Sequence, residues 1–578
     1  MSELDFVAPR SFKKALSAFE RGDLTKAEDH CATTLKFKPD YFDALHLLAV
    51  VQSQRGRHVA ALAAYDKALA IRPNNVLLLN NRAGALKELR RYDEALACYD
   101  KALELRHDYA DAYDNRGSVL MEIERYDDAL DSYANALILG PQNPHFLNNV
   151  GRALTRLKRS EEALACFEKA IALDPNFVDA LINSGVALKE LKRHDDALSY
   201  FDRALGTHPG HIEALLNRGS VFIVLKRSED AVTDYDTILR LQPDHASANL
   251  DRGVALTKLK RFDEALESYE RALSFGADPA HVSNNRCLTF IAAERYDKAL
   301  VCNEKALLLR PNYWEAWNAR GTLLAQMGLF EEAIASYRRA LALQPDDVES
   351  EWNIGCLFLL LGDYERGWPK YELRRNLGPV KWSKFNGPEW RGEPLEGKRL
   401  LLYAEQGFGD AIQFARFAAI AKAKGAHVIL GIYGALAELA RGLKGEPEIL
   451  PAGEALPQYD FHLPAMSMPL VLRLRKEDIP AEPYLQADPS RVDAWAKRLP
   501  QATARVGIAW QGSQWDPSRW IPLAAFAPLC RVPGVKLISL QKSDGLDQLE
   551  CSSHSRLGGH VSRRRLHAIA LGRRNRFV

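Results

Sequence analysis

The sequence predicts a mostly α-helical chain in which a superhelix of helical hairpins precedes an α/β domain. The first observation is a 34-residue period that holds from about residue 8 to 347, ten repeats without an insertion. The second is a change of pattern at residue 399, where short apolar runs begin to alternate with amphipathic segments. Such a period is typical of stacked helical hairpins, and such alternation is typical of a parallel sheet covered by helices.

Four residue types recur at fixed places in the repeat. Prolines mark the grid: Pro39, Pro73, Pro141, Pro175, Pro209, Pro243, Pro311 and Pro345. An alanine stands twelve residues before each grid point, as at Ala163, and an aromatic eight before most of them, as at Phe167. A glycine stands twenty-four residues before most of them, as at Gly151. Small residues let two helices approach closely, the aromatic is expected to fill the gap against the next repeat, and proline ends the second helix.

A ladder of carboxamides runs through the repeats at one position of the first helix, twenty-six residues before the grid. Its rungs are Asn81, Asn115, Asn149, Asn183, Asn217, Asp251, Asn285 and Asn353, with Ala319 interrupting the series. Asn is a middling helix former, so packing alone gives little reason to repeat it there. Its side chain suits the backbone of an extended peptide, because it offers two donors and an acceptor. The alternative is that each Asn ties its own helix to the next repeat.

The repeat resembles the tetratricopeptide repeat, a helix–turn–helix unit whose stack presents a concave groove. The ladder resembles the one that lines the superhelix of O-linked N-acetylglucosamine transferases and holds their polypeptide substrates. This resemblance implies that a polypeptide or a partner protein binds in the groove. The departures at Asp251 and Ala319 are expected to weaken the middle and the end of that groove.

The composition is that of a soluble globular chain of several domains. With 578 residues, 47% apolar and 26% charged residues and a net charge of +2, it gives no overall pull toward nucleic acid or membrane. We expect no signal peptide at the start and no transmembrane helix, since no stretch approaches 18 uninterrupted apolar residues. The eight cysteines are scattered without a CxxC pair, which favours reduced, packed thiols and a cytoplasmic protein.

The pattern after the repeats predicts short strands and helices in alternation. A partial eleventh repeat extends to residue 376, and a segment rich in Pro, Gly and Trp at 377–398 is interpreted as a linker whose tryptophans pack rather than stack on a ligand. Strands are expected at 399–404, 427–433, 448–451, 459–463, 505–511 and 535–541, and helices at 411–424, 435–443, 491–499 and 523–530.

One tight loop carries the candidate chemistry. Gly407, Gly409 and Asp410 lie between the first strand and its helix, at the edge of a parallel sheet where ligands bind. The loop is not a GxGxxG dinucleotide fingerprint. Asp410 has two readings, a simple N-cap of the helix or a general base that takes a proton from an acceptor hydroxyl.

Several stretches resemble a glycosyltransferase of the GT-B type. These are LLLYAEQGFGDAIQFARF, YDFHLPAMSMPLVL, PYLQADPSRVDAW and VGIAWQGS with RWIPLAAFAPL and VKLISLQ, which are similar to heptosyltransferase-type domains fused to tetratricopeptide repeats in bacteria. The resemblance implies a Rossmann-like first half at 399–504 with Asp410 as base. It implies a nucleotide-sugar site at Gly407, Gly409, Gln511, Gly512, Ser513, Arg519 and Lys542, with no metal and no cofactor other than the nucleotide-sugar. Arg519 and Lys542 have the alternative of being surface charges.

The second half departs from that pattern. Residues 505–550 hold only two expected strands, and the family's later donor-site block is absent. Residues 551–578 are rich in Arg and lack Asp and Glu. This segment is a translation out of frame, a disordered basic tail or a nucleic-acid-binding arm. Two functions therefore stay open: a glycosyltransferase, active or inactive in this form, whose repeats hold the acceptor, and a non-catalytic scaffold for protein binding.

Overall fold

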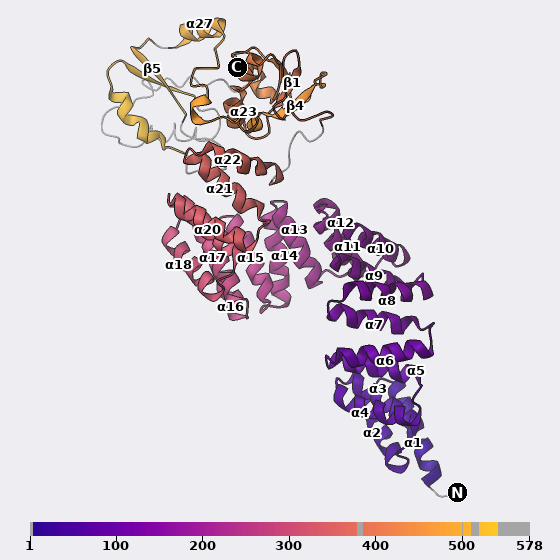
Figure 1. The fold of residues 1–578 in the computed structure, drawn as a ribbon. Coiled ribbons are helices and arrows are strands. Elements are labelled where there is room, and N and C mark those ends of the chain that lie inside the picture. The colour runs from indigo at the N-terminus through magenta and orange to yellow at the C-terminus, as the bar shows by residue number, and fades with distance from the viewer. Residues whose placement is uncertain (1–3, 378–384, 500, 510–519, 541–578) are drawn as a thin grey trace. The chain divides into compact units, whose positions relative to one another are not determined.

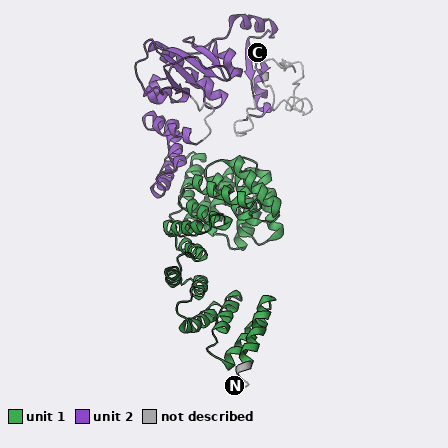
Figure 2. Cartoon of the chain, turned by 90° about the vertical axis from the view of Figure 1, so that its right-hand side faces the viewer, with its two compact units in different colours: residues 1–329 green, residues 330–578 purple. Residues whose placement is uncertain are grey.

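The computed structural model describes residues 4–377, 385–499, 501–509 and 520–540, and it divides into two compact units. The N-terminal unit runs to Leu329 and the C-terminal unit starts at Phe330 (Figure 2). The division falls inside a repeat, so the last helical hairpins belong to the same compact unit as the sheet.

The N-terminal unit is a stack of antiparallel helical hairpins (Figure 1). The first helices of the hairpins, here the A helices, are α1 Leu4–Glu20, α3 Phe42–Gln54, α5 Val76–Glu88, α7 Ala110–Glu122, α9 Pro144–Arg156, α11 Val178–Glu190, α13 Ile212–Val224, α15 Ala246–Lys258, α17 Pro279–Ala292 and α19 Trp314–Gln326. The second helices, the B helices, are α2 Leu24–Phe37, α4 His58–Ile71, α6 Tyr92–Leu105, α8 Tyr126–Leu139, α10 Ser160–Leu173, α12 His194–Thr207, α14 Ser228–Leu241, α16 Phe262–Ser274 and α18 Tyr296–Leu309.

The helices of each hairpin end where the sequence places prolines and turn residues. B helices such as α10 end two residues before the grid proline, here Pro175, whose ring and missing N–H do not allow the helix to continue. The turn from A to B passes through a left-handed residue, as at Lys158 with φ 62°. The repeat length and the helical hairpins predicted from the period are thus confirmed.

The close approach of two helices in a hairpin depends on a glycine that faces an aromatic ring. A Cβ built on Gly185 of α11 would lie 2.5 Å from the Phe201 ring of α12. The same relation joins Gly117 and Tyr133, Gly151 and Phe167, Gly219 and Tyr235, and Gly253 and Tyr269. The ring therefore packs tightly against the glycine of its own hairpin. It also meets the next repeat, as the sequence predicts: the Tyr269 hydroxyl is hydrogen-bonded to Thr289 of α17, and the charge of Asp251 on α15 adds to the burial that raises the pKa of Tyr235.

The hairpin of α17 and α18 departs at both of these positions together. In α17 and α18 the glycine position holds Cys287 and the aromatic position holds Asn303, and both are fully buried. The smaller Asn side chain leaves room in which the thiol can lie. Asn303 Nδ2 also donates to the Ala316 carbonyl of α19 at 2.7 Å, which links this hairpin to the next A helix.

Arginines one residue after the ladder position clamp neighbouring hairpins. Arg116 of α7 donates to Asp100 of the preceding α6 at 2.7 Å and to Ser132 of its own α8 at 2.6 Å. Arg218 of α13 does the same with Asp202 and Asp234. Each guanidinium therefore spans two successive B helices, which adds polar continuity to the apolar stack.

The C-terminal unit begins with helices and continues with strands. Its helices before the sheet are α20 Phe330–Leu343, α21 Val348–Leu360, α22 Tyr364–Tyr371 and the 3-10 helix η1 Glu372–Asn376. A four-stranded parallel sheet in the order β3-β2-β1-β4 consists of β1 Arg399–Tyr403, β2 His427–Ile432, β3 Glu448–Pro451 and β4 Phe461–Pro464. Two further strands, β5 Ala504–Ile508 and β6 Val535–Ser539, pair in parallel with each other. The expected parallel arrangement is confirmed for these strands.

Side chains from the sheet and from the expected linker share one core. Leu400 and Leu402 of β1 are buried on one face of the sheet with Leu430 of β2, and Leu401 is buried on the other face, which is typical of strands covered on both faces. Trp390 is 2% exposed within this cluster, and its indole Nε1 donates to the Glu393 carbonyl at 2.8 Å. The Trp390 end of the linker is therefore part of the packed domain, as the packing interpretation of its tryptophans required.

The helices around the sheet match the prediction only in part, because those expected at 411–424 and 435–443 are broken into shorter pieces. They are α23 Phe408–Ala415, α24 Ala418–Ala423, α25 Ala437–Ala440, α26 Met468–Val471 and α27 Pro489–Arg498, with 3-10 helices η2 Gly434–Leu436, η3 Ala465–Ser467, η4 Lys476–Asp478 and η6 Leu523–Arg531. The expected helix at 523–530 is a 3-10 helix, and Pro528 inside it cannot donate an α-helical hydrogen bond. The tail at 551–578 lies outside the described residues.

Candidate functional site

Three rungs of the ladder donate their amide to a residue of the preceding A helix. Asn115 donates to Asn80 at 3.2 Å, Asn149 to Asp114 at 2.8 Å, and Asn183 to Asn148 at 2.9 Å, each acceptor lying 35 residues earlier. These bonds match the alternative interpretation, in which the rung ties its own helix to a neighbouring repeat. Burial raises the pKa of the Asp114 carboxyl, and the hydrogen bond from Asn149 opposes this shift.

The residue 35 positions earlier decides which rungs are bonded in this way. For Asn217, Asp251 and Asn285 it is Ile182, Leu216 and Leu250, and an aliphatic side chain cannot accept a hydrogen bond. Asn217 is instead bonded to its own helix α13 and to a lysine of the preceding A helix α11. Its Nδ2 donates to the Glu213 carbonyl at 3.0 Å, and its Oδ1 accepts from Lys189 Nζ at 2.8 Å.

Asp251 and Asn285 are the rungs of the N-terminal unit whose side chains make no hydrogen bond to another described residue. Both are partly exposed on the A helices α15 and α17. Burial raises the pKa of Asp251 to about 6, against the opposing charge of Lys189. We call the surface of the A helices that carries the rungs from Asn81 to Asn285 the ladder face. Asn81 accepts from Asn80 at 3.2 Å, and Asn353 lies on α21 of the C-terminal unit.

The alanine at position 319 leaves a buried acceptor of the preceding A helix without a hydrogen bond in the described part of the chain. Asn284 of α17 stands 35 residues before Ala319, and its buried Oδ1 has no hydrogen-bond partner among the described residues. In the bonded repeats the equivalent oxygen receives the rung's amide. An unmet buried acceptor costs free energy, so this site is a local weakness of the stack.

We expect Ala319→Asn to stabilise the N-terminal unit by about 0.5–1.5 kcal/mol, because the new amide can donate to Asn284 Oδ1. Urea unfolding followed by circular dichroism measures the change. Ala319→Asp is the matched control, since its carboxylate has nearly the same size but cannot donate and is expected to destabilise. Equal effects of the two variants would contradict the assignment of the orphaned oxygen to the missing rung.

The second candidate region is the carboxyl edge of the sheet in the C-terminal unit. Gly407 is the N-cap of α23, and Gly409 and Asp410 lie in its first turn. The N-cap interpretation of Asp410 is therefore wrong, because the helix starts three residues earlier than predicted. A Cβ at Gly407 would lie 3.6 Å from Asp410 Oδ2, so the carboxylate turns back toward the start of the helix, where the helix dipole favours a negative charge.

Two tyrosines, Tyr433 and Tyr371, interact electrostatically with the Asp410 carboxylate. The Phe408 side chain is half exposed, and its ring centroid lies 5.2 Å from that of Tyr433. Burial raises the pKa of the Tyr433 hydroxyl, and the charge of Asp410 adds to this shift. Burial raises the pKa of Tyr371 on α22 to about 12, again with a contribution from Asp410. The Asp410 charge therefore acts on the residue that directly follows β2 and on the last residue of α22.

A buried charge network at the same edge was not foreseen from the sequence. Arg374 of η1 donates to Glu405, after β1, at 2.6 Å, to Glu372 at 2.7 Å and to Ser467, after β4, at 2.7 Å. The Arg374 and Glu405 side chains are 3% and 6% exposed. Burial raises the pKa of Glu405 despite the nearby Arg374 charge. No local sequence motif predicts this network, because its members lie up to 95 residues apart in the chain.

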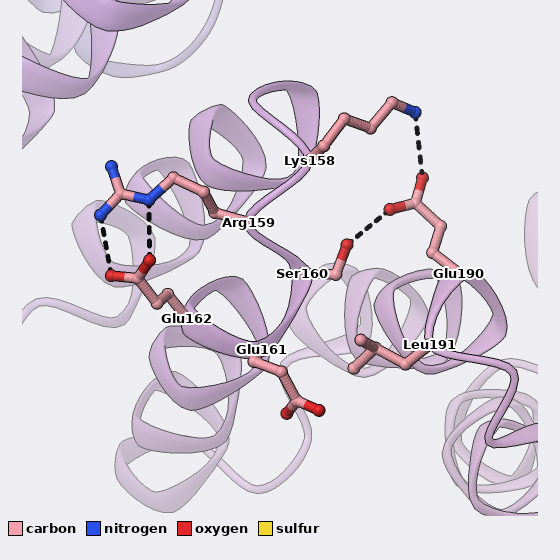
Figure 3. Close-up of a pocket in the computed structure, with 7 residues that line it drawn as sticks. All are labelled: Lys158, Arg159, Ser160, Glu161, Glu162, Glu190 and Leu191. Atoms are coloured by element: carbon pink, nitrogen blue, oxygen red, sulfur yellow. Dashed lines mark hydrogen bonds and ion pairs between the residues drawn. The ribbon is translucent and has the colours of Figure 1, made fainter. Parts of the chain in front are cut away.

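A hollow in the N-terminal unit lies away from the rungs. About 550 Å³ in volume and open to solvent, it is bordered by Lys158, Arg159, Ser160, Glu161, Glu162, Glu190 and Leu191 (Figure 3). Arg159 forms a two-point ion pair with Glu162, and Ser160 donates to Glu190 at 2.7 Å. Since its charged groups largely pair with one another, we assign no ligand to it.

The proposed donor-side residues Gln511, Gly512, Ser513, Arg519 and Lys542 lie outside the described residues. Within the described ranges, no cluster of three or more His, Cys, Asp or Glu side chains is arranged to hold a metal ion. In the same ranges, no helix combines the length and the apolar character needed to cross a membrane.

Comparison with known proteins gives relatives over parts of the chain. Protein FlbA of Caulobacter vibrioides is 28% identical over 212 residues, which span 32% of this chain and 36% of that protein. YrrB, described as a TPR protein with an unusual peptide-binding site, is 32% identical over 32% of this chain and 95% of its own, with a TM-score of 0.28. Yeast Tom70 is 17% identical over 65% and 93%, with a TM-score of 0.36.

Family models described as tetratricopeptide repeats match the helical region. They cover residues 12–76, 148–212 and 216–281, residues 288–352, residues 64–97, and, as a TPR repeat, residues 85–123. Together these matches take in more than half of the chain, and they coincide with the hairpins of the structure. The chain belongs to the tetratricopeptide-repeat family.

Proposed function

We propose that the repeats hold an extended polypeptide of a client or partner protein along the ladder face. The observation that carries this is the pair of adjacent rungs, Asp251 and Asn285, which keep hydrogen-bonding capacity that the fold does not use. Polar groups at equivalent positions of consecutive hairpins can each bond to a peptide group of one extended chain. Each bond contributes about 0.5–1.5 kcal/mol net, so several rungs must act together.

The test is binding of a random peptide library to the full chain. We expect Asp251→Ala combined with Asn285→Ala to weaken the selected peptides by roughly tenfold to a hundredfold, since two hydrogen bonds are lost. Asn149→Ala is the control, because that rung already bonds to Asp114. It is expected to lower stability while peptide affinity stays within about threefold. Unchanged affinity of the double variant would remove polypeptide binding on this face.

A second candidate function concerns the C-terminal unit. We propose that it is the Rossmann-like half of a GT-B glycosyltransferase that moves a sugar from a nucleotide donor to the polypeptide. This is supported by Asp410 with two glycines at the carboxyl edge of a parallel sheet, where such folds bind ligands. Asp410 would take the proton of the acceptor hydroxyl, with the donor held near Gly407, Gly409, Gln511, Gly512, Ser513, Arg519 and Lys542. The free cysteines suit a reducing compartment, so the proposed site of action is the cytoplasm.

The two candidates separate in a nucleotide-sugar hydrolysis assay on the full chain and on a version with the reading frame restored after residue 550. Turnover that falls at least a hundredfold in Asp410→Asn supports sugar transfer with Asp410 as base. No turnover in either protein removes the transferase proposal. Peptide binding that persists without any effect of nucleotide-sugars then favours the scaffold.

A further inference from the structure

The charge of Asp251 is not neutralised by direct contact within the fold. Lys189 is the charged group that acts on the Asp251 carboxyl, yet its ammonium donates to Asn217 at 2.8 Å and to Ser220 at 3.4 Å. Among the described residues, no cation lies within ion-pair distance of Asp251. A desolvated carboxylate without a partner is costly, so the site is poised to gain from an incoming donor.

Two neighbouring observations place the uncompensated charge on the ladder face. The Tyr235 hydroxyl of α14 is fully buried without a partner among the described residues. Burial raises the pKa of this hydroxyl, and the Asp251 charge adds to the shift. On α15 and α17, Val254 and Leu288 follow Asp251 and Asn285 by three residues, which puts them on the same helix face, and Leu288 is 42% exposed.

We propose that Asp251 binds a Lys or Arg side chain of the polypeptide held on the ladder face, and so selects clients with a basic residue at one position. This inference rests on the proposed polypeptide binding. A carboxylate accepts only, and charge-assisted hydrogen bonds are roughly twice as strong as neutral ones. The aliphatic stem of a Lys or Arg can lie on Val254 and Leu288 while its cationic end reaches the carboxylate.

The same reasoning divides the ladder into two kinds of rung. Asn115, Asn149 and Asn183 donate their amides to the preceding hairpin and so stabilise the stack of hairpins. Asp251 and Asn285 remain available to bind the polypeptide. The departure from Asn at position 251 therefore marks the specificity-determining rung, which reverses the expectation that it weakens the groove.

The experiment selects a displayed library of random 12-residue peptides on the wild-type chain, on Asp251→Asn and on Asp251→Lys. Asn stands at this position in most of the other repeats, so Asp251→Asn is expected to fold, and circular dichroism of each variant checks this. Asp114→Asn is the matched control, because its carboxylate already receives a hydrogen bond from Asn149.

We expect wild-type peptides to be enriched in Lys or Arg at one position, and individual peptides to bind Asp251→Asn roughly tenfold or more weakly. Asp251→Lys is expected to enrich Asp or Glu instead, and the control to keep the wild-type preference. Peptides selected without a basic residue, or equally enriched by Asp251→Asn, would overturn the inference and leave polypeptide binding standing. Failure of the wild-type chain to retain any peptide would remove polypeptide binding, and this inference with it.

Discussion

Replacing Arg374 by methionine is expected to destabilise the C-terminal unit by about 3–5 kcal/mol, the largest effect that the structure predicts for a single side chain. The guanidinium is 3% exposed and bonds to both Glu405 and Glu372. Methionine fills much of the same space but leaves Glu405 without its ion-pair partner in a site that water scarcely reaches, while Glu372 keeps only Arg375 as a cation. Removing one partner of a buried pair costs far more than the pair contributes when intact.

The loss should depend on pH in a defined direction. Burial already raises the pKa of Glu405 against the opposing charge of Arg374, so without that charge the pKa rises further. A carboxyl whose folded pKa is raised destabilises the fold when it is charged. Arg374→Met should therefore cost more at pH 7 than at pH 4.5, where protonation relieves the penalty.

Urea unfolding at the two pH values measures the effect, and hydrogen exchange in β1 and β4 localises it. Arg441→Met is the control, because Arg441 pairs with Glu438 at 2.7 Å but its side chain is 69% exposed. Such an exposed pair is expected to contribute less than about 1 kcal/mol. Equal losses for the two substitutions would show that the Arg374 network is not a buried, coupled unit.

Gly185→Ala is expected to destabilise the N-terminal unit by about 1–3 kcal/mol, although alanine is ordinarily the better helix former. The added methyl would lie 2.5 Å from the Phe201 ring, so α11 and α12 must move apart or the ring must leave its rotamer. Urea unfolding followed by circular dichroism gives the change, and hydrogen exchange in α11 to α13 shows where it acts.

Gly206→Ala in the same hairpin separates sterics from helix propensity. Gly206 lies in α12 with nothing within 4 Å of a built Cβ, so alanine there should stabilise by about 0.5–1 kcal/mol. A second check is the pair Gly185→Ala with Phe201→Leu, in which the smaller side chain should make the alanine less costly. Stabilisation by Gly185→Ala alone would refute the proposed glycine–ring contact.

Much of the fold followed from periodicity. The 34-residue grid gave the hairpins, and alternating apolar runs gave the positions of the strands within a few residues. The same reasoning did not pair Gly185 with Phe201, because a repeat pattern shows that both positions recur but not which surfaces meet. It also placed Asp410 before its helix, since the start of α23 depends on how Gly407 leaves β1.

The candidate site was predictable only in part. The ladder of asparagines could be found from the sequence, but its two roles could not, because they depend on the residue 35 positions earlier in a neighbouring helix. Asn183 finds an acceptor in Asn148, whereas the residue 35 positions before Asp251 is Leu216, which cannot accept a hydrogen bond. The charge network of Arg374 could not be predicted from the spacing of residues along the chain, because its partners Glu405 and Ser467 are distant in sequence.

The sequence by itself determined the repeat, its length and the order of helices and strands, because these depend on local propensity and on periods of burial along the chain. Only the tertiary structure decided which polar groups have partners. Hydrogen bonds between hairpins and ion pairs across a sheet edge depend on distances between residues far apart in the chain. That is why Asp251 is distinguished from the other rungs by its surroundings and not by its place in the repeat.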